Sequence, residues 1–345
     1  METNIMLGLQ HAISRDARFN FTIVAAECVG TSWSPSYSQK QIEEGLLSQG
    51  IEFTSGADLD LNNFRESVFL TSTPYDIYLP DKFKSENIIR YGYLVNIGYG
   101  VNLLSNVGLY AEVPGSNPYL ERCSYVFVDE DSPSKVIDKT RVGSAKVFFY
   151  NDVLESNRIY RNYSSDPVVS WKPRWTLNFD STLFSFLLEF HKLTNEIKGL
   201  KLILIEHPLL RSKLRESGKL DYFENWESQM FETGRYSIAS KNESLIECFK
   251  SDIFVADISS TIYEFSFTGK PILYTSPDVP LNNYGKRVTK VCYKINSPNE
   301  LRDTILKLLN GKDLLKTKRR RLLKKQQARL GKPYDLILNY LSLLK

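Results

Sequence analysis

The sequence is poor in the residues that build the commonest metal, redox and membrane structures. Its 345 residues include four cysteines, which stand far apart without a C-x-x-C pair, and three scattered histidines. This distribution argues against a zinc site or a disulfide framework and favours reduced, mostly buried thiols in a cytoplasmic protein. Stretches of about 18 uncharged apolar residues are missing, and the first thirty residues hold no sustained apolar run. We therefore expect neither a membrane-spanning helix nor a secretory signal.

Several familiar catalytic motifs are absent as well. The sequence contains no P-loop, no G-x-S-x-G and no H-E-x-x-H. Gly98-Tyr99-Gly100 begins like a dinucleotide fingerprint, but Leu103 stands where the third glycine belongs. The run Asp129-Glu130-Asp131 has a D-x-D form that could bind a metal with a nucleotide diphosphate, although acids after a strand are more often only solvated. Nothing in the sequence demands a metal or another cofactor.

Positive charge is concentrated near the end of the chain. The segment 312–332 holds ten Lys or Arg and one acid, so its net charge is +9. Because the whole chain has a net charge of +4, the rest of the chain carries −5. It lacks proline and has leucines at 315, 322, 323 and 330, a pattern that predicts a helix with a narrow apolar stripe. Such a helix is either a solvated surface or a binding surface for an anionic membrane; nucleic acid is disfavoured, because no RNA-binding motif accompanies it. The predicted membrane contacts are Lys318, Arg319, Arg320, Arg321, Lys324 and Lys325.

Apolar strand-like runs alternate with helical stretches, which is typical of α/β folds with parallel sheets. The expected strands are 22–26, 67–70, 93–97, 125–128, 168–170, 201–205, 253–256 and 271–274, and the expected helices include one from about 132 and those at 181–198, 242–250 and 261–268. The polar stretch 161–167 reads as a linker. We therefore predict two doubly wound, Rossmann-like domains, 1–160 and 165–311, facing a cleft, followed by basic amphipathic helices over 312–345. Ligands should collect at the carboxyl ends of the strands.

The second predicted domain has polar residues after several strands. His207 follows strand 201–205, where it could donate to a phosphate or move a proton, or simply be a loop histidine beside Pro208. Ser259, Ser260 and Thr261 follow strand 253–256 and open a helix, whose N–H groups and dipole favour an anion. Alternatively, Thr261 and Glu264 form a capping box that uses these side chains within the helix.

Two further positions carry the same ambiguity between binding and structure. Arg174 lies between Trp171 and Trp175, where it could stack on a base and pair with a phosphate, or belong to an ordinary pair of core and surface tryptophans. Asp278 follows the strand 271–274 and could hold sugar or polyol hydroxyls, or serve as a turn residue after Pro277.

Taken in order, these segments resemble a known family. The series Trp171-x-Pro173-Arg174-Trp175, His207-Pro208-Leu209, Ser251-Asp252, Asp257-x-Ser259-Ser260, Lys270-Pro271-Ile272 and Asp278 is similar to the CDP-glycerol glycerophosphotransferases of teichoic-acid and capsule synthesis. The resemblance covers about residues 168–280. It implies a GT-B fold, with a donor-binding second domain, an acceptor-side first domain and a location at the cytoplasmic face of the membrane.

The resemblance also implies roles for individual residues. His207 and the cluster 259–261 would hold the donor pyrophosphate, helped by Arg174, while Glu264 or Asp278 would approach the donor hydroxyls. Many family members carry Trp-His-Gly in the first domain, but this chain has Tyr99 at the position of that candidate base. An unperturbed tyrosine has a pKa near 10, so it is a poor base at neutral pH.

The predicted activity is transfer of a polyol phosphate, such as glycerol phosphate, from a CDP-activated donor to a hydroxyl of a lipid-linked or polymeric cell-surface glycan. Two alternatives stay open. One is a GT-B glycosyltransferase that uses a nucleotide sugar, with nearly the same phosphate-binding residues. The other is a non-catalytic scaffold of a polymer-assembly complex, which the tyrosine at position 99 keeps possible.

Overall fold

Two units with parallel sheets make up the chain in the computed structural model. One, the C-terminal unit, comprises Val101–Asn106 and Tyr150–Arg329; the other, the N-terminal unit, comprises Glu2–Gly100, Val107–Phe149 and Leu330–Lys345. The described residues are 9–10, 12–13, 15–31, 36–48, 50–98, 100–101, 103–105, 118–128, 139–143, 145–148, 166–177, 181–240, 244–276, 278–329 and 333–344.

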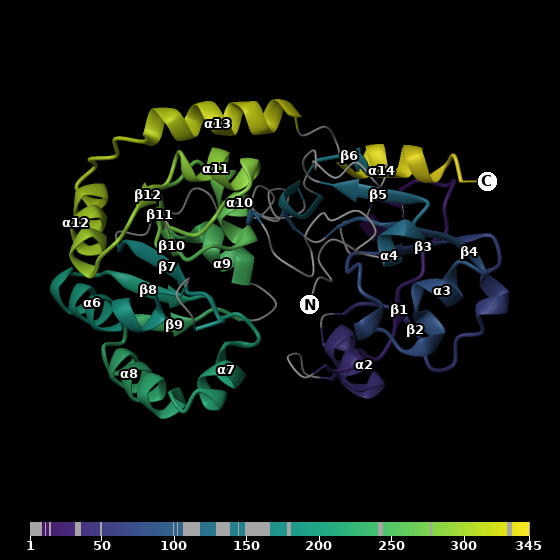
Figure 1. The fold of residues 1–345 in the computed structure, drawn as a ribbon, viewed down its shortest axis with the longest axis horizontal. Helices are drawn as coiled ribbons and strands as arrows, with labels where there is room; N and C mark the ends of the chain where they lie inside the picture. Colours follow the sequence, from purple (N-terminus) through teal and green to yellow (C-terminus); the bar gives the residue numbers. More distant parts are fainter. Residues whose placement is uncertain are drawn as a thin grey trace. The chain divides into compact units, whose positions relative to one another are not determined.

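The C-terminal unit is built on a six-stranded sheet (Figure 1). Its elements are β7 (Val168–Lys172), α6 (Leu183–Glu196), β8 (Lys201–Leu204), α7 (Leu210–Glu216), α8 (Leu220–Glu232), β9 (Tyr236–Ile238), α9 (Ser244–Lys250), β10 (Ile253–Ala256), α10 (Ser260–Ser266), β11 (Ile272–Tyr274), α11 (Asn283–Thr289), β12 (Tyr293–Lys294), α12 (Pro298–Leu309) and α13 (Lys316–Arg329). The strand order is β12-β11-β10-β7-β8-β9 and every pairing is parallel. This is the Rossmann order, in which the winding direction reverses between β7 and β10.

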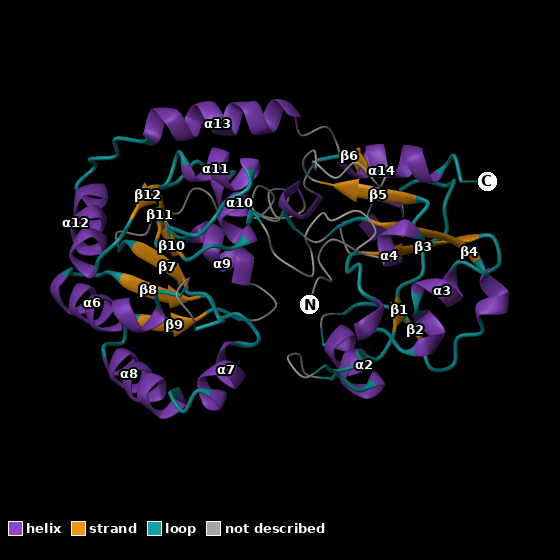
Figure 2. Ribbon diagram, viewed as in Figure 1, coloured by secondary structure: helices purple, strands orange, loops and turns teal. Residues whose placement is uncertain are grey.

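Both faces of this sheet are covered by helices, as its continuous apolar strands predict (Figure 2). On one face, α6, α7, α8 and α12 pack with strand side chains such as Val169 and Val255 into one core cluster. On the other, Phe254 of β10 packs against Phe265 of α10 in a tilted arrangement, with ring centroids 5.0 Å apart. The carboxyl edge of the strands is thus the part of the sheet that the two helical layers leave for a ligand.

The N-terminal unit contains two smaller parallel sheets, ordered β3-β4-β5-β6 and β1-β2. Its elements are β1 (Val24–Ala25), α2 (Gln39–Leu47), β2 (Thr54–Ser55), η1 (Leu61–Phe64), β3 (Ser67–Thr71), η2 (Asp76–Tyr78), η3 (Asp81–Phe83), α3 (Ser85–Ile88), β4 (Gly92–Asn96), α4 (Pro118–Glu121), β5 (Tyr125–Val128), β6 (Lys139–Arg141) and α14 (Pro333–Leu341). Gly98, just beyond β4, has a φ of 65°, which glycine adopts without strain.

The end of the chain differs from the prediction of a separate basic segment. Helix α13 is basic and belongs to the C-terminal unit, but α14 carries no Lys or Arg and belongs to the N-terminal unit. Ile337, Leu338 and Leu341 of α14 are buried in a core cluster with Val95 and Phe127. Apolar residues at every third or fourth position give α14 an apolar side, which packs in the core of the N-terminal unit. The position of α14 therefore depends on burial of this side and not on charge.

Candidate active site

Four loops bring polar residues to the carboxyl edge of the six-stranded sheet. Arg174 follows β7, His207 follows β8, Ser259 follows β10 and Asp278 follows β11. Because all these strands are parallel, their carboxyl ends lie at one edge, as the sequence predicts. The loops after β7 and β10 flank the reversal point of the sheet, where doubly wound folds bind their ligands.

A buried carboxylate, that of Asp257, holds three of these loops together. Its Oδ2 accepts the backbone N–H of Arg174 at 2.8 Å and that of Thr182 at 2.9 Å. Its Oδ1 accepts the hydroxyls of Thr182 at 2.6 Å, Thr275 at 2.7 Å and Ser276 at 3.1 Å. The side chain is 1 % exposed, so five hydrogen bonds replace its lost hydration. Asp257 therefore holds the loops after β7, β10 and β11 in fixed positions relative to one another.

Arg174 is anchored beside the amino end of α10. Its Nη1 donates to the carbonyl of Ile258 at 3.2 Å and its Nε donates to Thr176 Oγ1 at 3.1 Å. Trp171, in contrast, is 0 % exposed and belongs to the core of the unit. Trp171 is therefore a core residue and Trp175 is half-buried, so Arg174 is not sandwiched between two exposed indoles.

His207 stacks on Trp175, with ring centroids 5.1 Å apart and an angle of 18° between the planes. Burial and the nearby charges of Lys172 and Arg174 lower the pKa of His207 to about 3. The ring is therefore neutral at pH 7. Its Nδ1 accepts the N–H of Leu209 at 3.2 Å, which places the ring proton on Nε2. His207 is thus a neutral hydrogen-bond donor at the edge of the sheet.

The helix α10 begins at Ser260, with Ser259 as its N-cap in an extended conformation. The Ser259 hydroxyl makes no capping bond; it is buried, with no hydrogen-bond partner among the described residues. The capping-box alternative is wrong, because Ser259 is the N-cap and both Thr261 and Glu264 lie inside the helix. Arg174 binds the carbonyl of Ile258, the residue before Ser259. The Ser259 hydroxyl is therefore a hydrogen-bond donor that a ligand in this part of the site could use.

The other predicted site residues fall in different surroundings. Asp278 is exposed in the turn after β11, and the buried Glu264 lies below the edge; a contact of either with donor hydroxyls stays a prediction. Tyr99 and the acidic run 129–131 lie outside the described residues. Within the described part of the chain, no three His, Cys, Asp or Glu side chains are grouped to hold a metal ion.

The basic helix α13 spans Lys316–Arg329, as predicted, but its cations do not all face solvent. Arg319 is 1 % exposed, donates through Nε to the Gly269 carbonyl at 3.2 Å and pairs with Asp313. The prediction that Arg319 contacts a membrane is therefore wrong, because its side chain fastens the helix to the protein. The other five predicted residues, Lys318, Arg320, Arg321, Lys324 and Lys325, are exposed.

None of the helices in the described ranges is long and apolar enough to span a bilayer. A search of curated protein sequences found no match. Among solved structures, the wall teichoic acid polymerase TagF soaked with CDPG matches with 18% identity and a TM-score of 0.50, covering 80% of this chain and 71% of TagF. A UDP-GlcNAc 2-epimerase from Neisseria meningitidis bound to UDP-GlcNAc matches with 10% identity and a TM-score of 0.65, covering 100% and 97%. A glycosyltransferase from Rickettsia africae matches with 12% identity and a TM-score of 0.52, covering 99% and 94%.

These likenesses establish the fold, which is GT-B-like as predicted. The family comes from the sequence. Residues 159–328, which include the loops of the candidate site and all of α13 except Arg329, match the model of the CDP-Glycerol:Poly(glycerophosphate) glycerophosphotransferases. Through residues 159–328, just under half of its length, the chain is therefore identified as a transferase enzyme that matches the CDP-glycerol:poly(glycerophosphate) glycerophosphotransferase family.

Proposed function

We propose that this chain transfers glycerol phosphate, or a similar polyol phosphate, from a CDP-activated donor to a hydroxyl of a polymeric or lipid-linked glycan. The observation that carries this proposal is the unpartnered Ser259 hydroxyl beside Arg174, at the reversal point of a Rossmann sheet. A diphosphate offers the acceptor oxygens that this hydroxyl, the guanidinium and the His207 Nε2–H would bind. The family match favours a CDP-polyol over a nucleotide sugar as the source of that diphosphate.

In the proposed step, the acceptor oxygen forms a bond to the phosphorus that bears the polyol. The bond from this phosphorus to the bridging oxygen breaks, and CMP leaves with the bonding electrons. The hydroxyl proton passes to solvent, because His207 already carries a proton on Nε2 and uses Nδ1 for Leu209. The protein contributes by positioning the groups and by stabilising charge on the phosphoryl oxygens, which are the main sources of catalysis in phosphoryl transfer.

The donor assignment predicts a selective response to cytidine nucleotides. Melting curves with CDP, CMP, UDP and GDP should show stabilisation by the cytidine nucleotides alone. A ligand at about 100 times its Kd stabilises a protein by about 2.7 kcal/mol, which is a rise of roughly 5–10 °C for a domain of this size. Turnover of radiolabelled CDP-glycerol with an acceptor should then release CMP. A shift selective for UDP or GDP, with release of that diphosphate, would instead show a nucleotide-sugar transferase.

We also propose that the exposed side of α13 holds the enzyme on the inner surface of the cell membrane. Each basic residue near an anionic bilayer contributes about 1 kcal/mol, an attraction that salt screens. Arg320 and Lys324 stand four residues apart on the exposed side of the helix. Reversing both charges should release the protein from anionic liposomes in a sedimentation assay, and rising salt should release the unaltered protein.

The matched control for this experiment reverses Lys192 and Lys198, two exposed lysines at α6 and the turn after it. The net charge change is identical, so only the position of the charges differs. If both double variants leave the liposomes equally, the attraction is a property of the net charge and α13 has no special role.

A further inference from the structure

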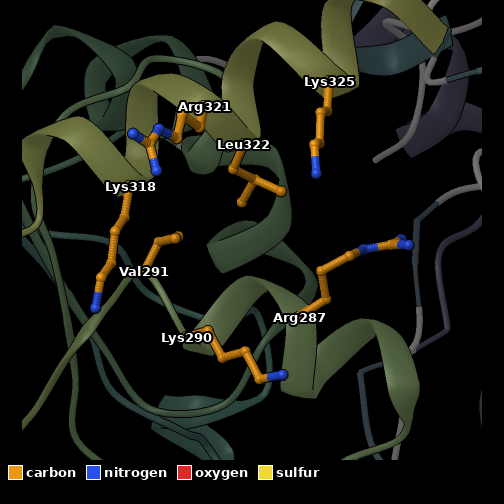
Figure 3. Close-up of a pocket in the computed structure, with 7 residues that line it drawn as sticks. All are labelled: Arg287, Lys290, Val291, Lys318, Arg321, Leu322 and Lys325. Atoms are coloured by element: carbon orange, nitrogen blue, oxygen red, sulfur yellow. The ribbon is translucent and has the colours of Figure 1, made fainter.

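A second site of a different kind lies between α11 and α13, where the structure has a pocket of about 380 Å³ (Figure 3). Such a volume is near the lower end of the range for small-molecule pockets. The lining residues are Arg287, Lys290, Val291, Lys318, Arg321, Leu322 and Lys325. Five of these seven residues are cations and none is an acid, so the pocket is strongly electropositive. We call it the α11–α13 pocket.

The pocket cations stand at regular helical spacings. On α13 the four lining residues occupy positions i, i+3, i+4 and i+7. The other three, one from α11 and two from the turn after it, occupy i, i+3 and i+4. Residues at these spacings share one side of a helix, so α13 turns a basic stripe toward Arg287 of α11 and Lys290 of the turn after it. In Figure 3, Lys318 and Lys325 extend from α13 toward the segment that carries Arg287 and Lys290, and the tip of Arg287 is directed away from Lys318.

Two of the hydrogen bonds that fasten α13 come from residues outside the pocket lining. A neighbouring stripe of α13 fastens it to the C-terminal unit: Arg319 reaches the Gly269 carbonyl, and Gln326 Nε2 donates to Ser266 Oγ at 3.0 Å. The one acid of the segment 312–332, Asp313, pairs with Arg319 and accepts the Tyr293 hydroxyl at 2.8 Å. The pocket therefore brings five positive charges together, and a bound anion would relieve part of their mutual repulsion.

The pocket and the candidate active site lie at opposite edges of the sheet. Lys290 and Val291 come just before β12, and Gly269, on which α13 packs, comes just before β11. Because the strands are parallel, these positions mark their amino ends, whereas His207 and Ser259 follow carboxyl ends. A ligand of the pocket is therefore not the donor diphosphate of the proposed reaction.

We infer that the α11–α13 pocket binds a phosphoryl group that carries two negative charges, as in a phosphate monoester or a diphosphate. Arginine offers a planar fork of donors that matches phosphate oxygens, and lysine adds compact charges around it. Arg287 and Arg321 supply one fork from each helix, with a lysine beside each. The group could belong to a soluble phosphate ester or to a phospholipid headgroup, since both present the same oxygens.

The test compares two variants with the same change in charge. One replaces the pocket residues, as Arg321→Gln with Lys325→Gln; the other replaces their neighbours outside the pocket, as Arg320→Gln with Lys324→Gln. Inorganic pyrophosphate is titrated calorimetrically at fixed ionic strength. The pocket variant should bind about tenfold more weakly at one site, and the control less than about twofold. Because the candidate active site is unchanged in both proteins, the difference reports on the pocket, and equal binding by both variants would overturn the proposal.

Vesicles identify the source of the phosphoryl group. Phosphatidic acid presents a phosphate monoester, whereas phosphatidylglycerol presents a diester, and the two are compared at equal surface charge. A preference of the unaltered protein for phosphatidic acid that the pocket variant loses assigns the site to a headgroup. Pyrophosphate binding without that preference assigns it to a soluble ester. Neither experiment uses transferase turnover, so failure here would leave the proposed donor site standing.

Discussion

Replacing His207 by alanine is expected to lower kcat by about 10²–10³ while the C-terminal unit stays folded. The neutral imidazole is held by the Trp175 stack and the Leu209 N–H, so its Nε2–H is a preorganised donor for charge that develops on the phosphoryl oxygens. Loss of one such donor typically reduces turnover by about this factor. Release of CMP from CDP-glycerol measures the effect, and His191→Ala, which removes an imidazole from α6, is the matched control.

The pH dependence separates this role from proton transfer. Because the pKa of His207 is lowered to about 3, the ring stays neutral as the pH falls from 8 to 6, whereas an ordinary histidine would gain a proton near 6.5. The loss of kcat/KM in His207→Ala should therefore be the same at pH 6 and pH 8, since kcat/KM reports the ionisation of the free enzyme. A change of kcat/KM with pH near 6.5 in the unaltered enzyme that is lost in His207→Ala would show instead that His207 transfers protons. Unchanged turnover in His207→Ala would exclude His207 from the active site, whereas lost turnover in a folded variant argues against a non-catalytic scaffold.

The sequence predicts strands best where they are buried on both faces. The continuous run Ile253–Ala256 has the predicted bounds, because only a central strand of a covered sheet buries four apolar residues in succession. The short edge strands β9 and β12 were not predicted. These strands, Tyr236–Ile238 and Tyr293–Lys294, are too short to show an alternation of apolar and polar residues in the sequence. They are strands because they pair with the neighbouring strands of the sheet.

The site is predictable in its location but not in its internal contacts. Parallel strands fix the edge to which His207 and Ser259 belong, so the two positions follow from the topology alone. The resemblance also contains residues that serve the fold: Lys270 Nζ donates to the carbonyls of Phe249 at 2.8 Å and Ser251 at 2.9 Å, which ends α9. A sequence motif alone does not show which of its residues stabilise the fold and which contact the ligand.

Asp257 shows why the internal contacts escape a reading of the sequence. It was part of the motif and received no role, since its partners at positions 174, 182, 275 and 276 are far apart in the chain. Only the packing of three loops at one edge brings those donors within reach of one carboxylate. A signal was present, because an acid directly after a fully buried strand needs partners at once.

Asp257→Ala is therefore expected to destabilise the C-terminal unit strongly, by about 3–5 kcal/mol of unfolding free energy. Removing one side of a buried charged network leaves its donors without acceptors, which costs about this much. Urea unfolding followed by tryptophan fluorescence measures it, because Trp171 and Trp226 lie buried in this unit. The variant should also lose its response to cytidine nucleotides, since the backbone of Arg174 is released from its anchor.

Asp252→Ala provides the matched control at the opposite end of the same strand. Its carboxylate accepts one hydrogen bond, from the Val168 N–H at 2.9 Å, so the expected loss is about 1 kcal/mol with nucleotide binding retained. Equal destabilisation by the two substitutions would mean that the five hydrogen bonds of Asp257 contribute no more than one. In that case the loops at the carboxyl edge would be held by packing alone, and the ligand-binding geometry would not depend on a buried charge.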